Sequence, residues 1–132
     1  GAFFGLTRGA SRGHIARACI ESMAYQSKDL IKVMEDDLGT KIDSIKVDGG
    51  ASVNKLLVQF QADILEIPVV RPLLAETTAL GAARLAGLAV NFYEKEDFEV
   101  YEAERYEPNM DHEEVEKLYA RWLKAVKATQ EF

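Results

Sequence analysis

Two short apolar segments separated by a helical pattern constrain the fold of this 132-residue chain more than any other feature. Residues 42–48 and 68–72 contain β-branched residues, and prolines stand at both ends of the second segment, which is typical of strands. The chain between them has an apolar face of helical spacing formed by Val53, Leu57, Phe60 and Ile64. Ser52 is expected to cap that helix. Because a helix between two strands leaves no room for a hairpin, the pattern predicts a parallel strand–helix–strand unit.

Three further segments have helical patterns. Residues 14–38 end at Gly39 and have an apolar face made of Ile15, Cys19, Met23, Leu30 and Val33. Residues 76–90 are rich in Ala and Gly, so we expect this helix to pack very close to a sheet or another helix. Residues 111–131 predict a terminal amphipathic helix with a stripe of Val115, Leu118, Tyr119, Trp122 and Val126. The acidic residues 94–110 before it are interpreted as a solvated connector.

The inventory of predicted elements is short of strands. A parallel sheet normally has more than two strands and is covered on both faces, so this core is expected to continue in chain outside the sequence. The first residue is Gly1 and there is no basic leader, which we interpret as the start of an internal segment.

Composition disfavours several classes of function. The net charge is −6, and no basic stripe is present for binding a phosphate backbone, so a nucleic-acid partner is not expected. No apolar run of membrane-spanning length appears, so no membrane partner is expected either. Cys19 is the only cysteine and is interpreted as a small core residue in a reducing compartment. His14 and His112 fit no metal-ligand spacing, so no metal ligands are predicted.

The turn after the first predicted strand is the candidate site. Gly49 and Gly50 stand between residues 42–48 and the following helix, where ligands of open α/β sheets bind. One interpretation is a tight turn in which glycine supplies positive φ. The other is that N–H groups at the helix start face a ligand such as a phosphate, with Asn54 one turn further on the same side. The spacing fits neither the P-loop nor the dinucleotide fingerprint.

Several blocks in order resemble the C-terminal domain of the FGGY carbohydrate kinases, and of the glycerol kinases among them. The blocks are residues 5–9, 14–18, 21–26, 47–51, 59–65 and 76–83, together with Asn54. The resemblance covers about residues 1–93 closely and the tail only loosely, through residues 122–126. It implies that residues 1–132 are the C-terminal part of an ATP-binding domain with an actin-like ATPase (ribonuclease H-like) fold, of class α/β with parallel strands and packed helices.

The same resemblance implies a function. The intact protein would transfer a phosphoryl group from Mg-ATP to glycerol, giving glycerol 3-phosphate, with ATP and Mg²⁺ as cofactors and ATP or ADP and glycerol as partners. It would be a cytoplasmic homo-oligomer. Within this chain the resemblance places the nucleotide against Gly49, Gly50 and Ala51, with the Asn54 side chain reaching the adenine. The catalytic aspartate of the family and its phosphate loops have no counterpart here, so no catalytic residue is assigned and the isolated chain is expected to be inactive.

Two alternatives stay open. The protein could be another FGGY kinase that acts on a pentulose, a pentitol or gluconate, since the substrate residues of the family lie mostly upstream. It could also be a non-catalytic interaction module in which the acidic residues 94–116 dock a partner. A domain that lacks strands also exposes a sheet edge and apolar helix faces, which favours self-association.

Overall fold

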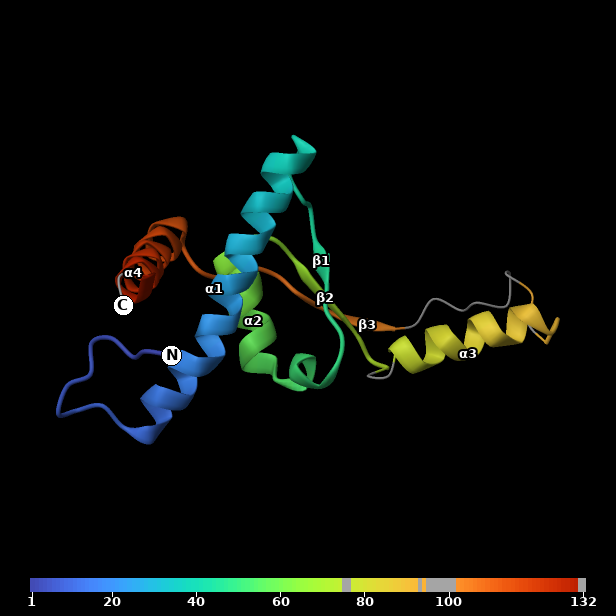
Figure 1. Cartoon of the computed structure of the whole chain (residues 1–132), viewed down its shortest axis with the longest axis horizontal. Helices are drawn as coiled ribbons and strands as arrows, with labels where there is room; N and C mark the ends of the chain where they lie inside the picture. Colours follow the sequence, from blue (N-terminus) through green and yellow to red (C-terminus); the bar gives the residue numbers. More distant parts are fainter. Residues whose placement is uncertain (75–76, 93, 95–101, 131–132) are drawn as a thin grey trace.

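The computed structural model describes residues 1–74, 77–92, 94 and 102–130. Their elements, in chain order, are α1 (Arg12–Leu38), β1 (Ile45–Lys46), the 3-10 turn η1 (Gly50–Val53), α2 (Lys55–Leu65), β2 (Val69–Pro72), α3 (Thr77–Ala89), β3 (Ala103–Tyr106) and α4 (His112–Gln130). Residues 1–10 form an irregular segment, and Figure 1 shows them looping beside the start of α1. No helix in the described part of the chain is long and apolar enough to cross a bilayer.

The three strands form one mixed sheet in the order β1-β2-β3. β1 pairs with β2 in parallel, with Ile45 opposite Val69, so the predicted strand–helix–strand unit is confirmed. β3 pairs with β2 antiparallel, with Val70 opposite Arg105. This third strand lies inside the segment 94–110, which the sequence pattern predicted to be a connector only. Its side chains alternate between exposed and half-buried, as expected for a strand at the edge of a sheet.

Helix α2 lies between two apolar clusters, and its predicted face is largely confirmed. On one side Leu57, Phe60 and Ile64 pack with Ala24 and Tyr25 of α1 and with α4. On the other side Val58, Ala62 and Leu65 pack with Val69 of the sheet. Val53, which was expected to extend the first side, is instead 57% exposed, because it belongs to η1 and not to the helix.

Helix α4 docks on α1 through aromatic residues. The Tyr25 ring stacks on Trp122 at 5.4 Å between ring centroids. The carboxylate of Asp29 accepts hydrogen bonds from the Tyr119 hydroxyl at 2.6 Å and from Trp122 Nε1 at 2.8 Å. Val115 and Tyr119 are buried, and Leu118 and Trp122 are partly buried, so the predicted docking stripe is confirmed at these four positions.

The predicted core face of α1 is wrong for this chain. Ile15, Met23, Leu30 and Val33 are between 39% and 61% exposed, and Cys19 is exposed too. The residues that α1 does bury are Ala24, Tyr25 and Lys28, which face α2 and α4. The helix is apolar on two sides, and the described chain covers one of them. The helix also begins two residues earlier than predicted, because Ser11 forms a capping box with His14.

The close packing expected of the Ala/Gly-rich helix is also not found. α3 buries none of its residues, and Figure 1 shows it extending away from the other helices. A Cβ added at Gly81 would meet no heavy atom within 4 Å, so that glycine makes no close approach within this chain. Glu76, where the helical segment was predicted to begin, lies outside the described residues.

Candidate functional site

The turn after β1 is shaped by one glycine and leaves the other beside open space. Val47 N–H still donates to the Val70 carbonyl at 2.9 Å, and the chain leaves the sheet directly afterwards. Gly49 has φ of 84°, which side-chain-bearing residues rarely adopt, so glycine is needed there. Gly50 has no such φ, yet a Cβ added there would also meet nothing within 4 Å. The absence of a side chain at Gly50 therefore leaves its backbone accessible. Neither a positive φ nor close packing against the described residues requires glycine at this position.

The residues after Gly50 form the 3-10 turn η1, held by short-range hydrogen bonds. Ser52 N–H and Asn54 N–H donate to the Gly49 and Ala51 carbonyls, each at 3.1 Å. The Ser52 hydroxyl also donates to the Gly49 carbonyl at 2.7 Å, and Ser52 is buried. We call residues 49–54 the Gly-Asn loop. Of its four predicted site residues, Gly50, Ala51 and Asn54 are exposed and Gly49 is half-buried.

Asn54, not Ser52, is the N-cap of α2, which corrects the sequence prediction. Its Oδ1 accepts hydrogen bonds from the backbone N–H groups of Leu56 at 3.0 Å and Leu57 at 3.3 Å. The turn η1 delays the start of the helix by two residues, so the capping role passes from Ser52 to Asn54. This arrangement fixes the orientation of the amide that the family resemblance places near adenine.

The start of α3 lies beside the same turn. The Thr77 hydroxyl donates a hydrogen bond to the Asp48 carboxylate, which directly precedes the Gly-Asn loop. Thr77 begins the Ala/Gly-rich helix and Asp48 directly precedes the glycine turn, so no local motif connects them. The structure joins the two, although they are 29 residues apart in sequence, and so places the first turn of α3 next to the candidate site.

Charged residues behind the loop were missed by the sequence analysis. Arg71 of β2 donates to the Ser52 carbonyl at 3.4 Å and to Glu104 of β3 at 2.9 Å. Lys55, the residue after Asn54, also reaches Glu104, at 3.5 Å. The separations of 19 to 49 residues explain why no local motif shows these contacts.

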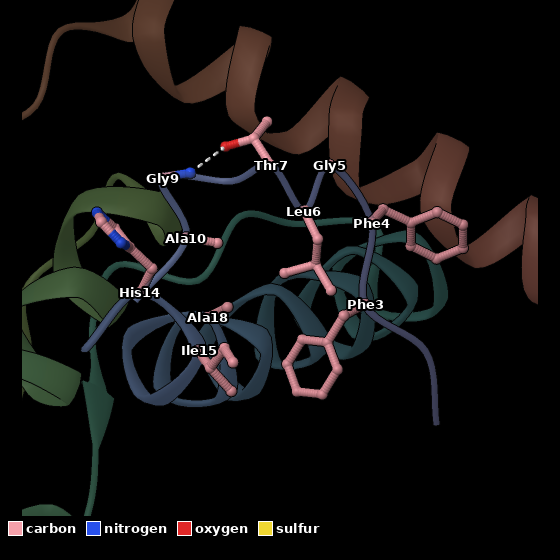
Figure 2. A pocket seen from close by; sticks show the side chains of 10 residues that line it. All are labelled: Phe3, Phe4, Gly5, Leu6, Thr7, Gly9, Ala10, His14, Ile15 and Ala18. Atoms are coloured by element: carbon pink, nitrogen blue, oxygen red, sulfur yellow. Dashed lines mark hydrogen bonds between the residues drawn. The ribbon is translucent and has the colours of Figure 1, made fainter. Parts of the chain in front are cut away.

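Two hollows of the described surface lie away from the Gly-Asn loop. One of about 320 Å³ is lined by the irregular segment of residues 3–10 and the first turns of α1, and Figure 2 shows that segment passing over the helix. A second, of about 510 Å³, lies between residues 1–5, α1 and α4. Neither of these two is lined by Gly49, Gly50, Ala51 or Asn54.

At the other end of α2 the structure gathers possible metal ligands that the sequence did not suggest. Ligand atoms of Glu66, His112 and Glu116 lie within 4.8 Å of one another. However, the ammonium group of the buried Lys28 lies 3.4 Å from the Glu66 carboxylate and 3.8 Å from Glu116. A divalent cation would have to compete with this ammonium for both carboxylates. We therefore interpret the group as an ion-pair cluster.

Titration of this cluster is coupled. His112 Nδ1 lies 2.6 Å from Glu66 Oε1, and this hydrogen bond raises the pKa of His112 above 6.5. Burial alone would raise the pKa of Glu66, but the hydrogen bond from His112 and the charge of Lys28 outweigh it, so the pKa of Glu66 is lowered. Glu66 also has φ of 59° as the C-cap of α2. The cluster thus ties α4 to the C-terminal end of α2, about 16 Å from the Gly-Asn loop at its N-terminal end.

Comparison with known proteins identifies the family. Residues 1–90 match the FGGY family of carbohydrate kinases, C-terminal domain. The chain is 58% identical to a glycerol kinase of Clostridium beijerinckii, covering 98% of this chain and 27% of that protein. It is 54% identical to a glycerol kinase of Fusobacterium nucleatum, over all of this chain and 27% of that protein. The chain therefore spans about a quarter of the length of the curated relatives it matches.

Solved structures agree on the fold. A crystal structure of Plasmodium falciparum glycerol kinase with ADP matches 96% of this chain and 26% of its own, with a TM-score of 0.80 and 31% identity. Gluconate kinase from Lactobacillus acidophilus matches with a TM-score of 0.69 and 27% identity, over 96% of this chain and 26% of its own. The mixed sheet with packed helices is thus part of the actin-like ATPase fold of these kinases, as the resemblance implied. The chain belongs to the FGGY family of carbohydrate kinases, and residues 1–90 match the family's C-terminal domain.

Proposed function

We propose that this chain forms the adenosine-binding wall of an ATP-dependent glycerol kinase. The intact enzyme would transfer the γ-phosphoryl group of Mg-ATP to a terminal hydroxyl of glycerol, giving glycerol 3-phosphate. Support comes from the curated relatives, which are named glycerol kinases at 50% to 58% identity. It also comes from the structural relative that was solved with ADP.

The observation that carries the proposal is the geometry of the Gly-Asn loop. Gly50 presents a backbone with open space where a side chain would be, and Asn54 stands four residues later with its amide fixed by capping. A flat aromatic base needs such an uncluttered backbone to lie against. This pairing of an open glycine with an oriented amide favours a nucleoside over the bare phosphate that the turn alone suggested.

The capping bonds of Asn54 determine which of its atoms would meet adenine. Its Oδ1 already accepts from two backbone N–H groups. A contact with adenine would therefore use the two N–H donors of Nδ2, and the ring nitrogens of adenine are acceptors. Asn54 would thus have two roles: its Oδ1 caps α2, and its Nδ2 binds adenine.

The remaining chemistry would come from other parts of the intact enzyme. Among the residues from Asp48 to Asn54 the only carboxylate is Asp48, which already accepts from Thr77, so we place no ligand of Mg²⁺ in this loop. Mg²⁺ would enter with ATP as part of the substrate. Phosphoryl transfer depends on positioning and electrostatic stabilisation around the γ-phosphate, and we assign no catalytic residue to this chain. The chain alone is expected not to phosphorylate glycerol, and measurable product from the purified chain would contradict this.

A pair of substitutions at Asn54 separates its two roles. Asp caps helices about as well as Asn but carries no N–H donor, so Asn54→Asp should keep the stability of α2 and weaken ADP binding. Asn54→Ser, which also caps, should behave in the same way. Asn54→Ala should weaken ADP binding and also destabilise the fold, since the loss of an N-cap costs about 1 kcal/mol of unfolding free energy. Isothermal titration with ADP and thermal unfolding measure the two effects, and Val53→Ala on the exposed side of η1 is the matched control.

Gly50 offers an independent test of the same surface. Since a Cβ there meets nothing, Gly50→Leu should leave the unfolding temperature nearly unchanged while it blocks the nucleotide. Undiminished ADP affinity in both Gly50→Leu and Asn54→Asp would overturn the proposal. Because gluconate and xylulose kinases are also structural neighbours, the full-length protein should be assayed with glycerol, gluconate and xylulose in parallel. A preference for gluconate or xylulose would leave the family assignment unchanged and would replace glycerol as the proposed phosphoryl acceptor.

A further inference from the structure

One carboxylate behind the Gly-Asn loop is shared by three donors. Glu104 of β3 accepts from Tyr106 OH at 2.6 Å and from Arg71 at 2.9 Å, and Lys55 Nζ lies 3.5 Å away. The hydrogen bond from Tyr106 and the charges of Arg71 and Lys55 lower the pKa of Glu104, although desolvation opposes them. The carboxylate therefore stays charged at neutral pH and has a cation on each side.

The first of these cations reaches into the loop. Arg71 is only 14% exposed at its side chain, and it donates to the carbonyl of the buried Ser52 at 3.4 Å. Its Nε is buried and has no hydrogen-bond partner among the described residues. A cation removed from water to this degree needs a counter-charge to stay in place, and Glu104 supplies it. Without Glu104 the guanidinium would be expected to turn toward solvent and release the Ser52 carbonyl.

The second cation holds the other end of the loop. Lys55 directly follows Asn54 and is the first residue of α2. Arg71 contacts the Ser52 carbonyl and Lys55 directly follows Asn54, so Val53 and Asn54 lie between two held positions. The placement of Asn54 relative to the turn η1, which begins at Gly50, thus depends on a residue that lies about fifty positions further along the chain.

From this geometry we infer that Glu104 is a positioning residue for the nucleotide, acting through Arg71 and Lys55 on the Gly-Asn loop. The inference rests on the proposed function in so far as the loop is the part that contacts adenosine. It also assigns a role to β3, which lies beyond residues 1–90 that match the family domain.

A purely electrostatic effect of Glu104 would change ligand affinity differently from an effect on the position of the Gly-Asn loop. Removing the negative charge of Glu104 frees two cations near the loop, which would strengthen the attraction of a phosphate-bearing ligand. Loss of positioning would weaken any ligand that touches the loop, charged or not. Adenosine, which has no phosphate, therefore separates the two effects when it is compared with ADP.

The test uses Glu104→Gln and Arg71→Lys, with Arg105→Gln as the matched control. Arg105 lies on the same strand and forms an exposed ion pair with Glu107 only two residues away, and the alternation of a strand turns it to the opposite face. Three quantities are measured for each variant: the affinity for adenosine, the affinity for ADP, and the amide hydrogen exchange of Ser52 and Asn54. Thermal unfolding verifies that each variant is folded.

We expect Glu104→Gln to weaken adenosine binding about fivefold and to speed exchange at both amides by a similar factor, since a charge-assisted hydrogen bond of a partly exposed pair is lost. Arg71→Lys should give a smaller loss, because it keeps the charge but not the reach to both partners. Arg105→Gln should change nothing. Unchanged exchange at Ser52 and Asn54 in Glu104→Gln overturns the inference, as does a change confined to ADP. If the wild-type chain binds neither ligand, the proposed function fails for this chain, and the exchange measurement still decides the positioning role.

Discussion

Helices α2 and α3 both begin beside the Gly-Asn loop, yet they differ completely in how they are held. α2 is buried on two sides, by α1 and α4 on one and by the sheet on the other. α3 has no fully buried residue and is tied to Asp48, the residue before the loop, by a hydrogen bond from Thr77. Both helices are rich in apolar or small residues, but only α2 has neighbouring elements in the described chain against which to bury them. The candidate site therefore has one rigid side and one weakly held side.

The largest expected effect comes from cutting into the packed helix. Ile64 is fully buried, so Ile64→Ala should lower the free energy of unfolding by about 2–5 kcal/mol. Leu85 of α3 is 69% exposed, and Leu85→Ala should change it by less than about 0.5 kcal/mol. Urea unfolding followed by circular dichroism measures both. Similar costs for the two substitutions would mean that α3 packs in solution in a way this structure does not show.

The next effect concerns how α4 is held against the packed side. Asp29→Ala leaves the Tyr119 hydroxyl and Trp122 Nε1 without their acceptor, which should cost about 2 kcal/mol. Trp122 is the only tryptophan, so its fluorescence follows the undocking of α4 directly. Asp37→Ala is the control, because Asp37 lies on α1 like Asp29 but at an exposed position near the end of that helix. A tryptophan signal that changes equally in both variants would contradict the anchor.

A smaller and pH-dependent effect is expected at the far end of α2. The pKa of His112 is raised above 6.5 by Glu66, so the protonated pair stabilises the fold fully below 6.5. That contribution is lost as the pH rises through the raised pKa of His112. The unfolding midpoint of the wild type should therefore fall over this range, and His112→Gln should remove this part of the dependence. Parallel pH profiles for wild type and variant would rule out the pair as its source.

The smallest effect is expected on the weakly held side. Thr77→Val removes the hydroxyl that donates to Asp48, which should speed amide exchange in the first turn of α3 while global stability shifts by less than about 0.5 kcal/mol. Thr78→Val, at the exposed neighbouring position, is the control. Equal exchange in the two variants would show that the hydroxyl contact does not hold the helix.

The elements that could be predicted from sequence are those whose partners lie nearby in the chain. The parallel pair β1 and β2, the packed face of α2 and the stripe of α4 follow from residue spacing, and the structure confirms them. The turn at Gly49 follows from its position after a strand, and the positive φ agrees. The family resemblance predicted the actin-like fold, which the structural relatives confirm.

The features that sequence did not reveal depend on distant residues or on missing neighbours. β3 has no β-branched residue and carries two adjacent charged side chains, Glu104 and Arg105, so its composition is that of a connector. The exposed face of α1 has a correct helical period, but periodicity cannot tell whether a partner is present. The pairing of Arg71 with Glu104 spans 33 residues, and only the sheet register brings the two together.

The pairing of β2 with β3 has a consequence for what this fold tolerates. The two strands close a loop of residues 73–102, and α3 lies within it. The entropy of closing a flexible loop grows only logarithmically, so doubling or halving its length changes the free energy by about 0.6 kcal/mol. Since α3 adds no buried contact to the rest, insertions or deletions in this segment should leave the sheet and the packed helices folded. The part of the chain most open to change in length is thus attached directly to the residue before the Gly-Asn loop.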